Sequence, residues 1–127
     1  MNRSQDWFSQ AERDLEQAKD SRSAGRHEWA CFAAQQAAER AVKALHLRCD
    51  QEAWGHVVAR LLDELPLLVP SELVEKGKVL DNFYVPARYP SGHAEGPPFR
   101  HYGTLQSSSQ AVEYATEIIE FVRSQMA

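Results

Sequence analysis

The architecture of this chain follows from residues 31–45, Cys31-Phe32-Ala33-Ala34-Gln35-Gln36-Ala37-Ala38-Glu39-Arg40-Ala41-Val42-Lys43-Ala44-Leu45. Small apolar residues recur there at helical spacing on one stripe: Ala30, Ala33, Ala34, Ala37, Ala38, Ala41 and Leu45. Alanine is the best helix former, and a face of small side chains lets a neighbouring helix approach closely. Trp29, Phe32 and Val42 flank the stripe, which is typical of a helix buried on most sides. We therefore expect a central helix over residues 28–47.

Helical periodicity and turn signals outside this segment predict four further helices and no strand. They are expected over residues 4–21, with Ser4 as the cap; 56–68, with Val57 and Leu68 facing inward; 71–84, with Ser71 as the cap; and 107–125. The predicted fold is all-α, an up-and-down antiparallel bundle of four to five helices that forms one domain over residues 1–127. A long loop rich in Pro and Gly, residues 86–103, precedes the last helix.

Composition and charge limit the classes of function that this chain can have. The 127 residues are 43% hydrophobic and 25% charged, which suits a protein with a buried core. No apolar run approaches the ~18 residues of a membrane span. The N-terminus lacks the apolar stretch of a signal peptide, and two cysteines indicate reduced thiols, so we expect a cytoplasmic protein. The net charge of −4 argues against non-specific nucleic-acid binding, which favours basic surfaces.

The loop over residues 86–103 carries the clearest candidate chemistry. Arg88 and His93 are separated by four residues, and Arg100 and His101 follow. Arginine forks onto phosphate oxygens, and histidine exchanges a proton near neutral pH. Long irregular loops in compact domains are usually either functional or disordered. The alternative is that Arg88 anchors the loop through an ion pair and that His93 is solvated.

Three segments together resemble the HEPN family. They are Trp7…Ala11-Glu12-Arg13-Asp14-Leu15…Ala18; residues 31–45 with His56 downstream; and Leu80-Asp81…Tyr84…Arg88-Tyr89-Pro90, followed by Tyr102 and a terminal helix. The resemblance spans nearly the whole chain. It implies a bundle of four or five helices that commonly dimerises. Many relatives are encoded beside a small nucleotidyltransferase, and some such pairs act as toxin and antitoxin.

The resemblance also leaves three functions open: a partner of a nucleotidyltransferase, a metal-independent ribonuclease, and a non-catalytic module that binds nucleotides or assists assembly. Ribonuclease branches use Arg and His separated by four to six residues, which Arg88 and His93 match. In those branches a polar residue usually follows the arginine, whereas Tyr89 and Pro90 follow it here. As a ribonuclease, the chain would use His93 to accept the 2′-hydroxyl proton and Arg88 to hold the phosphate oxygens.

The predicted ligand-binding residues are His56, Tyr84, Arg88, Arg100 and Tyr102. His56 is placed either at a helix N-terminus that binds an anion or at the core edge as a structural residue. Asp14, Glu39 and Lys43 interrupt apolar helix faces, so we expect ion pairs or solvated positions there. Gln35 and Gln36 are expected to bond across helices or across a dimer seam. The histidines and cysteines lack zinc-like spacing, so neither a metal nor a cofactor is predicted. A symmetric homodimer is expected to use helix 28–47 or the terminal helix.

Overall fold

Five helices account for most of the chain in the computed structural model, which describes residues 2–84, 95–97, 100 and 103–127. They are α1 (Ser4–Ser23), α2 (His27–Arg48), α3 (Val58–Asp63), α4 (Ser71–Asp81) and α6 (Leu105–Met126). Within these described ranges there is no strand. The predicted all-helical bundle is therefore confirmed.

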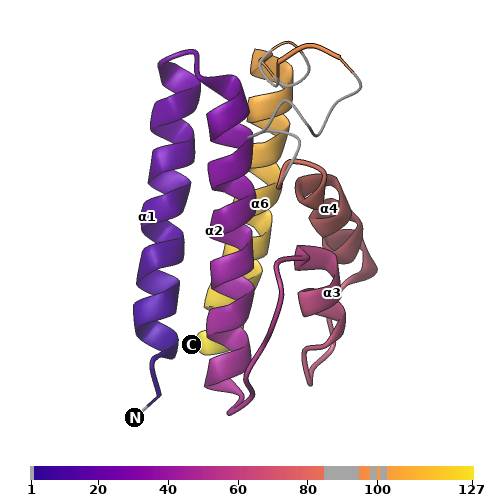
Figure 1. Ribbon diagram of the computed structural model, residues 1–127. Helices are drawn as coiled ribbons and strands as arrows, with labels where there is room; N and C mark the ends of the chain where they lie inside the picture. Colours follow the sequence, from indigo (N-terminus) through magenta and orange to yellow (C-terminus); the bar gives the residue numbers. More distant parts are fainter. Residues whose placement is uncertain (1, 85–94, 98–99, 101–102) are drawn as a thin grey trace.

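Helix α2 is the centre of the bundle, and it contacts α1, α3, α4 and α6. Figure 1 shows α1 and α2 side by side and antiparallel, with α6 behind α2 and running in the same direction as α2. The parallel pairing of α2 and α6 arises because the segment 49–57 returns along the bundle before α3 begins. Segment 49–57 thus takes the place of one helix in the up-and-down order of the chain, although it is not helical.

The alanine stripe of α2 forms the core, as its spacing predicted, except that Ala33 is only partly buried. Its members Ala30, Ala34, Ala37, Ala38 and Ala41 are 0% exposed, and Leu45 is 1% exposed. From α6, the apolar face of Ala111, Ala115, Ile118, Ile119 and Val122 joins the same core. Small side chains on α2 bring neighbouring helices close, so the residues beside the stripe are held in a tightly packed frame.

Two predicted helix caps are wrong. Ser4 is the first residue of α1, and the Asn2 side chain caps the helix by accepting a hydrogen bond from the Ser4 N–H at 2.8 Å. Ser71 likewise begins α4 directly after Pro70 and makes no capping hydrogen bond. Thr104 is the cap of α6, where its hydroxyl accepts from the Ser107 N–H at 3.1 Å, so α6 begins two residues before the predicted start.

The largest difference concerns α3, which is six residues long instead of the predicted thirteen over 56–68. It begins two residues later than predicted, because the Asp81 carboxylate binds the N–H groups of Val58 and Ala59. It ends early because Pro66, which has no N–H, cannot continue the helical ladder. Val57 and Leu68, predicted to face inward, are 50% and 92% exposed.

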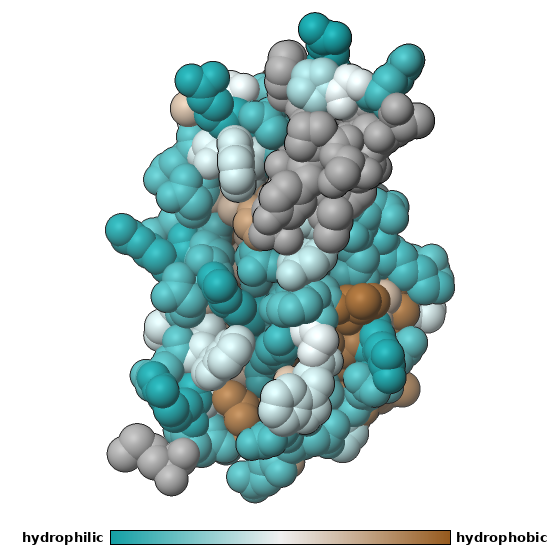
Figure 2. All heavy atoms as spheres, viewed as in Figure 1, coloured by the Kyte–Doolittle hydropathy of each residue, from teal (hydrophilic) through white to brown (hydrophobic). Residues whose placement is uncertain are grey.

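The C-terminal ends of the other helices differ by one to three residues from the predicted ranges. Helix α4 ends at Asp81 instead of residue 84, because Phe83 and Tyr84 make i to i+3 turns onto Leu80 and Asp81. Within the described ranges, no helix combines the length and the apolar character needed to cross a bilayer. The face in Figure 2 is mainly hydrophilic, with apolar residues gathered on the side of α3 and α4.

Candidate functional site

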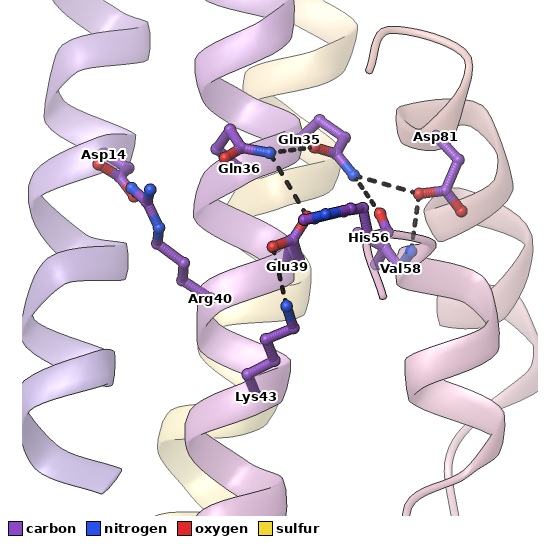
Figure 3. A network of polar contacts seen from close by, with 9 residues as sticks. All are labelled: Asp14, Gln35, Gln36, Glu39, Arg40, Lys43, His56, Val58 and Asp81. Atoms are coloured by element: carbon purple, nitrogen blue, oxygen red, sulfur yellow. Dashed lines mark hydrogen bonds and ion pairs between the residues drawn. The ribbon is translucent and has the colours of Figure 1, made fainter. Parts of the chain in front are cut away.

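A buried carboxylate organises the polar face of α2. Glu39 is 4% exposed, and its carboxylate accepts hydrogen bonds from Lys43 Nζ at 3.2 Å, His56 Nδ1 at 3.1 Å and Gln36 Nε2 at 3.4 Å (Figure 3). We call Gln36, Glu39, Lys43 and His56 the Glu39 cluster. A buried charge needs partners of this kind, because leaving it unpaired costs several kcal/mol.

His56 is held from three sides. Its backbone carbonyl accepts from the Gln35 side-chain amide at 2.8 Å, and its ring stacks on Tyr84 with centroids 5.0 Å apart and planes at 13°. Because the Glu39 carboxylate can only accept, Nδ1 carries the proton in the neutral ring and Nε2 holds the lone pair. The side chain is 57% exposed, so the imidazole faces solvent while these contacts hold it in one orientation.

A second polar seam fastens α3 and α4 to α2 behind this histidine. Gln35 is fully buried and approaches Asp81 Oδ1 at 3.4 Å. The two oxygens of Asp81 accept from the backbone N–H groups of Val58 at 2.7 Å and Ala59 at 3.0 Å. Burial raises the pKa of Asp81, although these hydrogen bonds oppose the increase. The seam fixes the chain where segment 49–57 meets α3, and so it fixes His56.

Aromatic side chains extend from His56 along the bundle. Tyr84 lies 6.2 Å from Phe32 between ring centroids, and Phe32 lies 6.2 Å from Trp29 in an edge-to-face pair. Trp29 is 50% exposed and lines a hollow of about 340 Å³ between α1 and α2. Arg40, which pairs with Asp14 at 2.5 Å across these two helices, also lines that hollow.

A second hollow opens on the other side of the Glu39 cluster, and we call it the Trp54 hollow. Its volume is about 390 Å³, and its lining includes Trp7, Lys43, Glu52, Trp54, Gly55 and His56. Trp54 is 81% exposed and Trp7 is 37% exposed. The ammonium of Lys43 lies 5.9 Å from the centroid of the Trp7 ring. An imidazole, an ammonium and two indoles therefore share one concave surface.

The structure brings together two of the predicted ligand-binding residues, His56 and Tyr84. Arg100 is exposed, and its role as a ligand-binding residue stays a prediction. Arg88, His93 and Tyr102 lie outside the described residues, so their roles stay predictions. The helix N-terminus proposed to bind an anion beside His56 is already engaged, because Asp81 binds the first N–H groups of α3. A ligand-binding role for His56 therefore depends on its ring.

The ion-pair and amide predictions have clear outcomes. Asp14 pairs across the bundle, and Glu39 and Lys43 pair within α2. Gln35 bonds across helices to Asp81, whereas the amide of Gln36 bonds within α2 to Gln35 and Glu39. Sequence reasoning gave no role to Asp81 or Arg40. Their periodicity showed helical positions, but it carried no sign of which distant groups they would meet.

Comparison with known proteins gives one family. The HEPN domain family matches residues 4–125. The crystal structure of a protein from Thermus thermophilus has a TM-score of 0.95 at 49% identity, covering 98% of this chain and 99% of that one. An archaeal HEPN homologue has a TM-score of 0.86 at 38% identity, with 100% of both chains covered. An HEPN domain protein from Thermotoga maritima has a TM-score of 0.74 at 35% identity, covering 93% of this chain and 94% of that chain. No curated protein matches.

Proposed function

This chain belongs to the HEPN family, and from that premise we propose that it is a homodimeric module that binds nucleotide or RNA and acts with a nucleotidyltransferase partner in a toxin–antitoxin-like pair. The proposal that the chain binds nucleotide or RNA rests on the imidazole of His56, which its neighbours hold in one orientation. It is half-exposed, bonded to a buried carboxylate and stacked on Tyr84. Such a group can exchange hydrogen bonds with a ligand without first losing conformational freedom.

The charge of the chain supports a local site over a broad nucleic-acid surface. With a net charge of −4, the protein as a whole does not attract a polyanion. A ligand that binds here has to gain its affinity from stacking and hydrogen bonds at a few positions. Aromatic side chains are well suited to this, because every nucleobase offers a flat face.

Calorimetric titration of the purified protein with ATP, GTP and a short single-stranded oligoribonucleotide tests the binding proposal. We expect His56→Ala to weaken binding by about tenfold, in line with the loss of one hydrogen bond to a fixed group. Arg13→Ala is the control, because Arg13 is an exposed cation of α1 that pairs with Glu16 at the surface. Absence of heat with all three ligands at millimolar concentration contradicts the proposal.

Dimerisation is supported by an indole left open on α2. Trp29 is half-exposed near the N-terminal end of this helix. Sedimentation equilibrium at micromolar concentration measures the mass directly. We expect about twice the 14.4 kDa of one chain, and a mass near 14.4 kDa excludes the homodimer under those conditions.

The partner is tested separately. Co-expression with a nucleotidyltransferase encoded beside this chain is expected to give a complex that survives gel filtration. A chromosomal neighbourhood without a short reading frame that carries a Gly-Ser pair and paired aspartates argues against this part of the proposal. Neither result bears on whether the chain alone binds nucleotide.

The ribonuclease is a second candidate because Arg88 and His93 keep the spacing of the catalytic branches. Incubation of the protein with RNA in the presence of EDTA tests it. We expect cleavage that His93→Ala abolishes and that needs no metal. Equal digestion by the His93→Ala variant excludes His93 as the catalytic residue, and absence of digestion by either protein leaves the binding module as the function.

A further inference from the structure

The indole of Trp54 is displayed on a fixed segment of backbone. Trp54 is 81% exposed although indole is among the largest apolar groups in proteins. Its segment is held at His56 by the Gln35 amide and at Val58 by Asp81. Gly55 follows at φ +92°, a backbone conformation that glycine adopts readily and that residues with a side chain rarely adopt. Exposure of this indole therefore follows from a defined loop geometry.

A second indole shares the Trp54 hollow. Trp7 from α1 also lines it, and one face of Trp7 lies over the Lys43 ammonium at 5.9 Å. The hollow measures about 390 Å³, within the range of roughly 300–1,000 Å³ typical of small-molecule sites. Two indoles on one concave surface provide the flat apolar contact that a planar ring needs.

The charges around the Trp54 hollow favour a neutral ligand. Lys43 is neutralised by Glu39 at 3.2 Å, and Glu52 adds a negative charge to the lining. Among the described lining residues, no permanent cation is left without a carboxylate partner. A phosphate therefore gains little there. A heteroaromatic ring gains more, because its edge can bond to His56 Nε2 or to a remaining N–H of the Lys43 ammonium.

Resting on the proposed binding of nucleotide or RNA, we infer that the Trp54 hollow takes one unpaired nucleobase. Trp54 stacks on the base, His56 and Lys43 contact its edge, and the phosphate stays in solvent. The site thus contacts the base and makes no contact with the phosphate. Adenosine and adenosine 5′-monophosphate are therefore expected to bind with similar affinity. Their affinity should change little between about 50 and 200 mM salt, unlike that of a ligand held through phosphate contacts.

NMR of the three indole N–H groups in the unsubstituted protein provides the first test. Titration with adenosine is expected to shift the signals of Trp7 and Trp54 and to leave that of Trp29 in place. Inorganic phosphate at the same concentration is expected to shift none of them. Shifts produced by phosphate, or by adenosine at Trp29 alone, overturn the inference.

Substitution provides the second test, measured by anisotropy of a labelled single-stranded oligoribonucleotide and by calorimetry with adenosine. Trp54→Ala is expected to weaken binding by roughly 5- to 150-fold, the range for loss of one stacking aromatic, whereas Trp54→Phe retains most of the affinity. Trp29→Ala is the matched control, because Trp29 is also a solvent-exposed indole, at 50%, but lines the other hollow. The affinity of this variant is expected to stay within about twofold of the original.

The outcomes separate this inference from the proposed function. If RNA binds with unchanged affinity in Trp54→Ala, the nucleobase site is wrong while the binding function stands. If neither adenosine nor RNA binds the unsubstituted protein, both are wrong. If Trp54→Ala halves the sedimentation mass without changing affinity for adenosine, a second copy of the chain covers the Trp54 hollow and the inference is overturned.

Discussion

Replacing Asp81 with alanine is expected to weaken the attachment of α3 more than any other single polar change. The Asp81 carboxylate accepts hydrogen bonds from the N–H groups of Val58 at 2.7 Å and Ala59 at 3.0 Å, and from the Gln35 amide at 3.4 Å. Val58 is 0% exposed and Ala59 is 6% exposed. Their N–H groups are therefore poorly placed to find water when the carboxylate is removed.

The size of the effect follows from two opposing contributions. Loss of the carboxylate that caps α3 leaves two N–H groups without an acceptor; loss of a helix N-cap costs about 0.5–2 kcal/mol, and each buried donor that stays unpaired costs about 1–3 kcal/mol, as two estimates of the same loss. Removal of the carboxylate also relieves its own burial, which raises the pKa of Asp81 and so opposes folding with the charged form. We expect a net loss of about 2–3 kcal/mol in the free energy of unfolding.

Urea unfolding followed by far-UV circular dichroism measures this loss as a fall in the transition midpoint of about 1 M. Hydrogen exchange locates it, since the amides of Val58 and Ala59 should lose protection first. Asp63→Ala is the matched control, because Asp63 lies at the exposed end of the same helix and should change stability by less than about 0.5 kcal/mol. A loss below about 0.5 kcal/mol in Asp81→Ala, with both amides still protected, refutes the reasoning.

Three further predictions use other parts of the chain. Burial raises the pKa of Asp81, so the folded protein binds a proton at this carboxyl more tightly than the unfolded chain does. The stabilisation from that proton is complete below the unfolded pKa and is lost as the pH rises through the folded pKa. The unsubstituted protein should therefore gain stability relative to Asp81→Asn as the pH falls from about 7 to about 4. No relative gain in urea midpoints over that range contradicts this sign. Burial, with a smaller contribution from Glu28, raises the pKa of Cys31 to about 12. Iodoacetamide at about pH 8 should therefore alkylate Cys49 in the folded protein and Cys31 only after unfolding, which mass spectrometry can measure. Equal labelling of Cys31 and Cys49 in the folded protein excludes the packing described. Ala38 is 0% exposed in the core stripe, so Ala38→Leu should lower the free energy of unfolding by about 1–3 kcal/mol, and an unchanged urea midpoint means that the stripe is not tightly packed.

Helical periodicity predicted the bundle because it depends on spacing within one segment. The stripe from Ala30 to Leu45 lies on one face in any helix, so its burial followed directly from the order of residues. The same reasoning failed over residues 56–68. There the apolar pattern continued through Leu68, while the length of α3 was set by Asp81, 22 residues beyond Ala59 in the chain. Contacts between distant segments are not encoded in local spacing.

The candidate site was predictable in its parts and not in its assembly. Glu39 and Lys43 were singled out as charges on apolar helix faces, and His56 and Tyr84 were predicted to bind a ligand. Their meeting depends on segment 49–57 returning along α2, which Figure 1 shows and no local pattern indicates. Trp54 is largely exposed, although tryptophan is highly buried on average. A glycine directly after it was the one local sign of a turn.

Stability alone does not explain the buried carboxylate of Glu39. An i, i+4 ion pair such as Glu39–Lys43 adds only about 0.3–0.5 kcal/mol when exposed, and burying it introduces a desolvation cost that its attraction often fails to offset. An apolar residue at this position would avoid that desolvation cost. What an apolar residue cannot do is fix the tautomer and direction of the His56 ring, which Glu39 does at 3.1 Å. The carboxylate is therefore better explained by its effect on the exposed imidazole than by its contribution to the bundle, and this is why we place the ligand site at His56.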